Sequence, residues 1–176
     1  GQEVAQQNPD ANGSVWFVND FNWAKNADEE MALMNDFDSK NTVIIDERQK
    51  AYTNGITPSN SSQNTISLTS FHPDNMVYNS NSSVVNFAVF SEIWYKGNVD
   101  WKAYIDGEEA EFIRVNYLLR GMKIPVGEHE IEFKFYPKSH YIGTKISLVF
   151  SSLIVLMIIG LIVMIVMKKD LPEAKD

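Results

Sequence analysis

Short segments rich in β-branched and aromatic residues follow one another from residue 65 to residue 136, with turn-forming residues between them. Apolar and polar positions alternate in several of them, which is typical of antiparallel strands with one buried face. SVVNFAVFS (83–91) is apolar at both parities and so indicates a central strand covered on both sides. The pattern predicts a mainly β fold, an antiparallel β-sandwich or jelly-roll-like domain over residues 65–139. Strands are expected in ISLTSF, MVYN, SVVNFAVFS, VDWKAYI, EAEFIRV, YLLRGMKI and EHEIEFKFY.

The pattern before this domain predicts a small α/β segment over residues 1–52. SVWFV (14–18) is the first expected strand, and the apolar run TVIID (42–46) is expected to be a buried one. Residues 53–64 collect Asn, Ser, Gly and Pro, so they are expected to form a loop or linker.

A helix is expected between these two strands. Asn26 is a favourable N-cap, and Glu29 follows three residues later as in a capping box. The helix is predicted to end near Asp36. Its apolar stripe would consist of Ala27, Met31 and Met34.

Residues 146–167 form an apolar run of 22 positions without a charge. A helix of this length measures about 33 Å at 1.5 Å per residue, which matches a hydrocarbon core of about 30 Å. The alternative is a buried core helix, but a run that is apolar on every face has no polar side to show to water. Residues 140–169 are therefore expected to be a transmembrane helix with its flanks.

Lysines flank this expected span unequally. Three follow it and two precede it, so the positive-inside rule places residues 170–176 in the cytoplasm as a short tail. Residues 1–140 are then expected to be extracytoplasmic.

The stretch VDWKAYIDGEEAEFI (99–113) contains an Asp-Gly pair that predicts a tight type I′ hairpin turn. The register this implies groups opposite charges on one face and aromatic and small residues on the other. It places Trp101 in the core and Tyr104 on the polar face. The expected pairs are Ile105 with Glu108, Tyr104 with Glu109, Ala103 with Ala110, Lys102 with Glu111 and Trp101 with Phe112.

Arg120 conflicts with this alternation, because it shares the parity of Leu118, Met122 and Ile124. Three explanations are open: Gly121 marks a bulge that resets the alternation, a carboxylate holds the arginine, or the arginine lines a cleft and binds an anionic group. Arg114 and Asn116 lie just upstream. The three polar residues form the most interesting cluster in the part before the span.

Composition and motifs exclude several classes of function. The formal net charge of -8 argues against a nucleic-acid partner, and a chain without cysteine has no disulfide or thiolate chemistry. His72, His129 and His140 lie far apart, and His129 is interpreted as a rim residue beside a turn. Glycine-rich phosphate loops and nucleophile elbows are not found, and the DxD match at residues 36–38 is better explained as an acidic loop after a helix. We expect no catalytic residue, metal site or cofactor in this chain.

Several motifs resemble the C-terminal end of YfhO-type bacterial membrane proteins. The run FSEIWYKGNVDWKAYIDGEEAEFIRVNYLLRGMKIPVGEHEIEFKFYPKS (90–139) contains the family's motifs in the family's order, and Gly143 and a span follow it. NGSVWFVNDFNWAKNADEEM (12–31) is similar to the segment that precedes this region in the family.

The resemblance implies a large multi-span protein of the bacterial cytoplasmic membrane, similar to GT-C glycosyltransferases. Such proteins are thought to move a sugar from a polyprenyl-phosphate carrier to a cell-envelope polymer. This chain departs from that pattern, because it lacks the other spans and the loop acids expected to act as base. The implied role is that of a non-catalytic outer domain, whose partners would be the lipid bilayer, the remainder of the membrane protein, and a cell-envelope glycan or polyprenyl-linked sugar.

Two hypotheses follow for this outer domain. In the first it binds ligand: the rings of Trp94, Tyr95 and Tyr104 stack on sugars, and the cluster of Arg114, Asn116 and Arg120 meets phosphate or carboxylate groups. In the second it is a structural or protein-contact domain whose aromatic residues are buried against membrane-embedded partners. A single-span surface protein with a carbohydrate-binding role is a further alternative.

Overall fold

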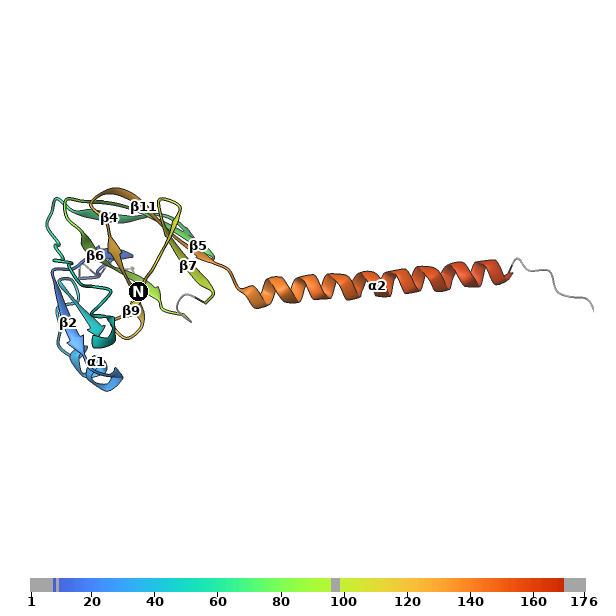
Figure 1. Ribbon diagram of the computed structural model, residues 1–176, viewed down its shortest axis with the longest axis horizontal. Helices are drawn as coiled ribbons and strands as arrows, with labels where there is room; N and C mark the ends of the chain where they lie inside the picture. Colours follow the sequence, from blue (N-terminus) through green and yellow to red (C-terminus); the bar gives the residue numbers. More distant parts are fainter. Residues whose placement is uncertain (1–7, 9, 96–98, 170–176) are drawn as a thin grey trace, which may run out of the picture. The chain divides into compact units, whose positions relative to one another are not determined.

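Antiparallel strands dominate the first part of the chain in the computed structural model (Figure 1). The structure describes residue 8, residues 10–95 and residues 99–169. The chain divides into two units, Gly1–Tyr136 and Pro137–Asp176. We call the first unit the β domain; the second contains one long helix. The predicted fold class, mainly β with antiparallel sheets and a C-terminal apolar helix, is confirmed.

Two sheets form the sandwich. One has four strands in the order β1-β6-β10-β9 and the other has five in the order β4-β5-β11-β7-β8, and the pairs within both are antiparallel. The strands of the first sheet are β1 (Val15–Phe17), β6 (Asn86–Ile93), β10 (Leu119–Ile124) and β9 (Ile113–Val115). The strands of the second sheet are β4 (Thr65–His72), β5 (Asn75–Ser82), β11 (Gly127–Phe135), β7 (Trp101–Ile105) and β8 (Glu108–Ala110).

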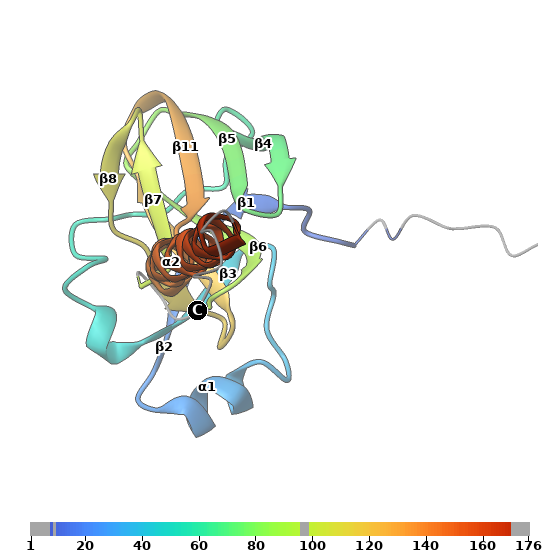
Figure 2. The ribbon, with the colours of Figure 1, turned by 90° about the vertical axis from the view of Figure 1, so that its right-hand side faces the viewer.

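A third layer was only partly expected. β2 (Asp20–Ala24) pairs in parallel with β3 (Thr42–Asp46), and α1 (Ala27–Leu33) connects them; the 3-10 helix η1 (Glu47–Gln49) follows. Figure 2 shows the five-stranded sheet on one side of the β domain and α1 on the other. The sequence pattern predicted β3 and the helix but not β2, whose polar residues at positions 20 and 22 obscure the strand pattern.

The apolar stripe predicted for the helix is wrong. The Asn26 side chain does cap the helix, accepting a hydrogen bond from the Glu29 backbone N at 2.9 Å. However, α1 ends at Leu33 rather than near Asp36, and its stripe of Ala27, Met31 and Met34 is exposed. The buried residue of α1 is instead the charged Glu30.

The four-stranded sheet is covered on both faces, as the parity of residues 83–91 predicted. Ala88 and Phe90 of β6 face the five-stranded sheet, where the rings of Tyr78, Phe112 and Phe133 fill the core. Phe87 and Val89 of the same strand face a second core formed with β3 and β9. An added Cβ at Gly121 would lie 2.7 Å from Phe87 Cζ, so glycine leaves the space that this ring occupies.

The hairpin β7–β8 has the predicted register at three of its five pairs. Ala103, Tyr104 and Ile105 pair with Ala110, Glu109 and Glu108, and Trp101 is buried. The pairs beyond Ala110 do not form, because β8 ends there and the chain crosses to the other sheet as β9. The single strand expected over residues 109–115 is therefore two strands, and Lys102 pairs its charge with Glu109 instead of Glu111.

The second unit contains helix α2 (Lys138–Lys169). Ser151 Oγ and Ser152 Oγ donate to the backbone oxygens of Ser147 and Leu148, so these hydroxyls are bonded within the helix. The tail predicted over residues 170–176 lies outside the described residues.

Candidate functional site

The β9–β10 hairpin positions the three polar residues that the sequence singled out. Arg114 pairs with Arg120 across the two strands, and Asn116 lies in the turn between them. Asn116 and Tyr117 adopt the left-handed conformation, with φ of 46° and 65°. Asparagine tolerates this region better than most residues. The three residues therefore belong to one hairpin, but their side chains contact different partners.

Asn116 binds the backbone of β3. Its backbone N donates to Ile44 O at 2.9 Å, and its Oδ1 accepts from Ile44 N at 2.8 Å. The residue is 4% exposed. Both hydrogen bonds join the hairpin to the third layer, so the observed partner of the Asn116 side chain is the protein itself.

Arg114 forms an ion pair with the buried helix residue Glu30. Its Nη2 lies 2.8 Å from Glu30 Oε2, and its Nη1 donates to Tyr117 O at 2.5 Å. Glu30 Oε1 accepts a second bond from Tyr117 N at 2.7 Å. The Glu30 carboxylate thus pairs with the Arg114 guanidinium and also binds the backbone of the hairpin turn. Glu30 was not predicted as a site residue. The available signal was its place in the first turn of a helix whose apolar stripe is narrow.

Arg120 lies inside the sandwich, 2% exposed. Its guanidinium carbon lies 4.2 Å from the Trp101 ring centre and 5.2 Å from that of Phe133, distances at which aromatic faces attract a cation. Nε donates to Ile93 O at 3.2 Å, whereas Nη1 is buried without a hydrogen-bond partner among the described residues. Burial lowers the pKa of this guanidinium. A register shift against β6 does occur, but between Leu119 and Arg120 and not at Gly121.

We expect Arg120→Met to leave the free energy of unfolding unchanged or to raise it by about 1 kcal/mol. Methionine fills similar volume among the rings and removes a desolvated charge, a replacement that is often neutral or stabilising. Urea unfolding in detergent, followed by tryptophan fluorescence, measures the change. Arg120→Ala is the control, because it leaves a cavity and is expected to be less stable. A loss for Arg120→Met as large as that for Arg120→Ala would contradict the prediction.

Of the three aromatic candidates, Trp94 and Tyr95 are adjacent residues after β6, whereas Tyr104 belongs to β7 of the five-stranded sheet. Trp94 follows β6 and is half-buried, with its ring centre 5.1 Å from that of Phe112. Tyr95 is 53% exposed. Tyr104 lies on the polar face of the five-stranded sheet, as predicted, with Lys134 Nζ 5.4 Å from its ring centre. Trp94 and Tyr104 therefore lie beside different partners, Phe112 in the core and Lys134 on the polar face.

His129 is at the rim, where the sequence placed it. Its Nδ1 lies 2.6 Å from Asp106 Oδ2, and its Nε2 lies 3.0 Å from Val126 O. The hydrogen bond with Asp106 raises the pKa of His129, and the hydrogen bond with His129 lowers the pKa of Asp106. Among the described residues, no three His, Asp or Glu side chains gather as a metal ion requires.

This pair predicts a small dependence of stability on pH. Because the pKa of His129 is raised, protonated His129 stabilises the folded state fully below the ordinary pKa of 6.5. This stabilisation is lost as pH rises through the raised value. The lowered pKa of Asp106 makes its contribution complete above the ordinary pKa of 3.8 and lost as pH falls through the lowered value. The pair is therefore strongest between these two ordinary values. Because Asp106 is half exposed, we expect about 0.5 kcal/mol.

The measurement compares the free energy of unfolding at mildly acidic and mildly alkaline pH. Asp106→Asn is the matched control, because asparagine also tolerates the positive φ of 52° found there. The native chain is expected to lose more stability than the variant as pH rises. An identical change in both proteins would contradict the assigned pair.

These features define a class of protein, a membrane protein with a folded β domain. Within the described part of the chain, Lys138–Met167 is one helix that is long and apolar enough to cross a membrane. The family model described as bacterial membrane protein YfhO matches residues 2–147, which is most of the chain. The chain belongs to the YfhO family. No curated protein and no solved structure matches it.

Proposed function

We propose that this chain is the extracytoplasmic, non-catalytic C-terminal domain of a multi-span membrane protein. The observation that carries the proposal is the connection between the two units: β11 ends at Phe135 and the apolar helix begins at Lys138. A folded domain joined to a membrane helix by two residues stays at the membrane. The lysines that follow the span favour a cytoplasmic C-terminus in the bacterial cytoplasmic membrane and put residues 1–140 outside.

The parent protein would resemble glycosyltransferases that move sugar from a polyprenyl-phosphate carrier to a cell-envelope polymer. In that arrangement the reacting groups come from the rest of the polypeptide. The β domain would contact that remainder or help to hold the acceptor glycan. This proposal implies that the chain by itself does not turn over a polyprenyl-linked sugar.

The orientation is tested by labelling single cysteines in cells, since the chain has none of its own. Val126→Cys places a thiol on an exposed turn of the β domain, and Ala174→Cys places one after the span. A membrane-impermeant maleimide is expected to label position 126 in intact cells and position 174 only after lysis. The reverse pattern would overturn the extracytoplasmic assignment.

A structural or protein-contact role is the second candidate for the domain. The Arg114–Glu30 ion pair favours this role, because the guanidinium proposed to bind an anionic ligand is already paired with a carboxylate of the protein. A glycan-binding role would then depend on Trp94, Tyr95 and Tyr104. Binding of the full chain to purified cell-envelope polymer, compared between the native protein and Tyr104→Ala, separates the two roles. Loss of binding supports glycan contact, whereas absence of binding in the native protein supports the contact role.

A further inference from the structure

Large apolar side chains are exposed at one end of the β domain. We call this the exit end, because β11 ends there and the chain continues to α2. Phe135 at the end of β11 pairs with Trp101 at the start of β7, which marks this end of the five-stranded sheet. Phe71 belongs to the same end, since it pairs with Met76, and Met76 pairs with Phe133.

The four-stranded sheet contributes to the same end. Leu119 at the start of β10 pairs with Ile93 at the end of β6. Arg120, the next residue of β10, lies 4.2 Å from the Trp101 ring, so the start of β10 and the end of β11 are on the same side of the core. The exposed residues of the exit end are Phe71, Ile93, Tyr95, Val99, Leu118 and Tyr136, each between 42% and 62% exposed.

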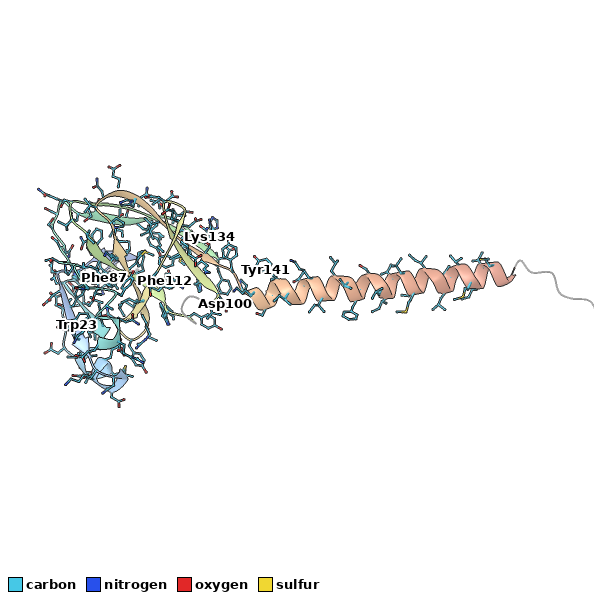
Figure 3. All side chains as sticks on the ribbon, viewed as in Figure 1. Trp23, Phe87, Asp100, Phe112, Lys134 and Tyr141 are labelled. Carbon is cyan, nitrogen blue, oxygen red and sulfur yellow. The ribbon has the colours of Figure 1, made fainter. Side chains whose placement is uncertain are left out.

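The opposite end of the sandwich differs in character. The β10–β11 turn and the loop before β6 expose Val126 and Val84, while the β7–β8 turn is Asp106-Gly107. Figure 3 shows Asp100 and Lys134 together at one end of the β domain and Trp23 far from them. Among the described residues of the β domain, the large exposed apolar side chains elsewhere are Met31 and Met34 at helix α1 and Val84 and Val126 at the opposite end, so the exit end has the largest group.

The covalent link between β11 and α2 indicates what the exit end contacts. Only Tyr136 and Pro137 lie between β11 and α2, and the three Cα–Cα steps from Phe135 to Lys138 span about 11 Å at most. Exposed apolar side chains gathered at one end of a domain indicate an interaction surface, and tyrosine is enriched where a protein meets the membrane interface. Asp74 and Asp100 lie at the same end, and Lys134 there is paired with Glu132, so this end is not a basic surface that attracts anionic headgroups.

We propose that the exit end lies against the bilayer, with its six apolar residues inserted at the level of the lipid headgroups. The partner is therefore lipid, reached through apolar insertion. The inference rests on α2 crossing a bilayer, as in the proposed function, but it does not depend on which side of the membrane the β domain occupies.

The test uses the full chain in phosphatidylcholine vesicles, with one environment-sensitive fluorophore on a single introduced cysteine. Val99→Cys and Leu118→Cys report on the exit end from two distant parts of the sequence. Val126→Cys is the matched control, an exposed valine at the other end. Leu156→Cys reports on the apolar helix and shows whether it is inserted.

We expect the labels at positions 99 and 118 to emit at shorter wavelength than the label at 126 and to lose most of their intensity to lipid-borne quenchers. Labels at 99 and 118 that resemble 126, while 156 is quenched, would overturn this inference and leave the membrane anchor intact. A shift to shorter wavelength without lipid quenching would also overturn it, because the exit end would then meet protein. Failure of 156 to be quenched would refute the anchor, and this inference with it.

Discussion

Glu30→Ala is expected to lower the free energy of unfolding of the β domain by about 3 kcal/mol, because removing one partner of a buried ion pair leaves the other unpaired. Glu30 is fully buried and accepts bonds from both Arg114 Nη2 and Tyr117 N. Removing this carboxylate leaves Arg114 Nη2 and the Tyr117 backbone N–H without their acceptor. Urea unfolding of the full chain in detergent, followed by tryptophan fluorescence, measures the effect.

The matched control is Glu47→Ala. Glu47 also forms an ion pair, with Lys50 at 2.9 Å, but both side chains are substantially exposed. Exposed pairs contribute about 0–1 kcal/mol. Equal losses for the two variants would contradict the structural role assigned to Glu30.

Phe133→Ala should lower the free energy of unfolding by about 3–5 kcal/mol, as truncation of a buried phenylalanine commonly does. Its ring is fully buried, with centres 5.0 Å from Phe90 and 5.2 Å from Phe112. Alanine would leave a cavity between the sheets, because neighbouring rings close such a space only in part. The same unfolding assay measures it.

Phe71→Ala provides the comparison for this truncation. Phe71 is 57% exposed on the same sheet, so the same atoms are removed with little cavity. A change within about 0.5 kcal/mol is expected. If Phe71→Ala were as damaging as Phe133→Ala, burial between the sheets would not explain the loss.

Local patterns predicted the parts of the fold that local chemistry determines. The Asp-Gly turn predicted the β7–β8 register, since a two-residue turn fixes which residues face each other. Asn26 and Glu29 predicted the start of α1 by the same kind of short-range bonding. The alternation of apolar and polar positions did not predict where β8 ends, because the chain crosses from one sheet to the other there.

The candidate site was harder to predict, because its partners are distant in sequence. Arg114 meets Glu30, 84 residues away, and Asn116 meets Ile44, 72 residues away. The sequence around Glu30 does not indicate that its partner is Arg114. Parity did place Arg120 among core residues, but the rings that surround it come from β7 and β11 as well as from the segment before β9.

The pairing of β1 with β6 bears on how the nascent polypeptide matures. Val15 pairs with Phe90, and β9 and β10 of the same sheet are made later still. Contacts between distant segments slow folding, since a long loop must close before they form. The first strand therefore stays unpaired until about 75 further residues have been made, and the last strand of the domain, β11, is made just before the apolar helix.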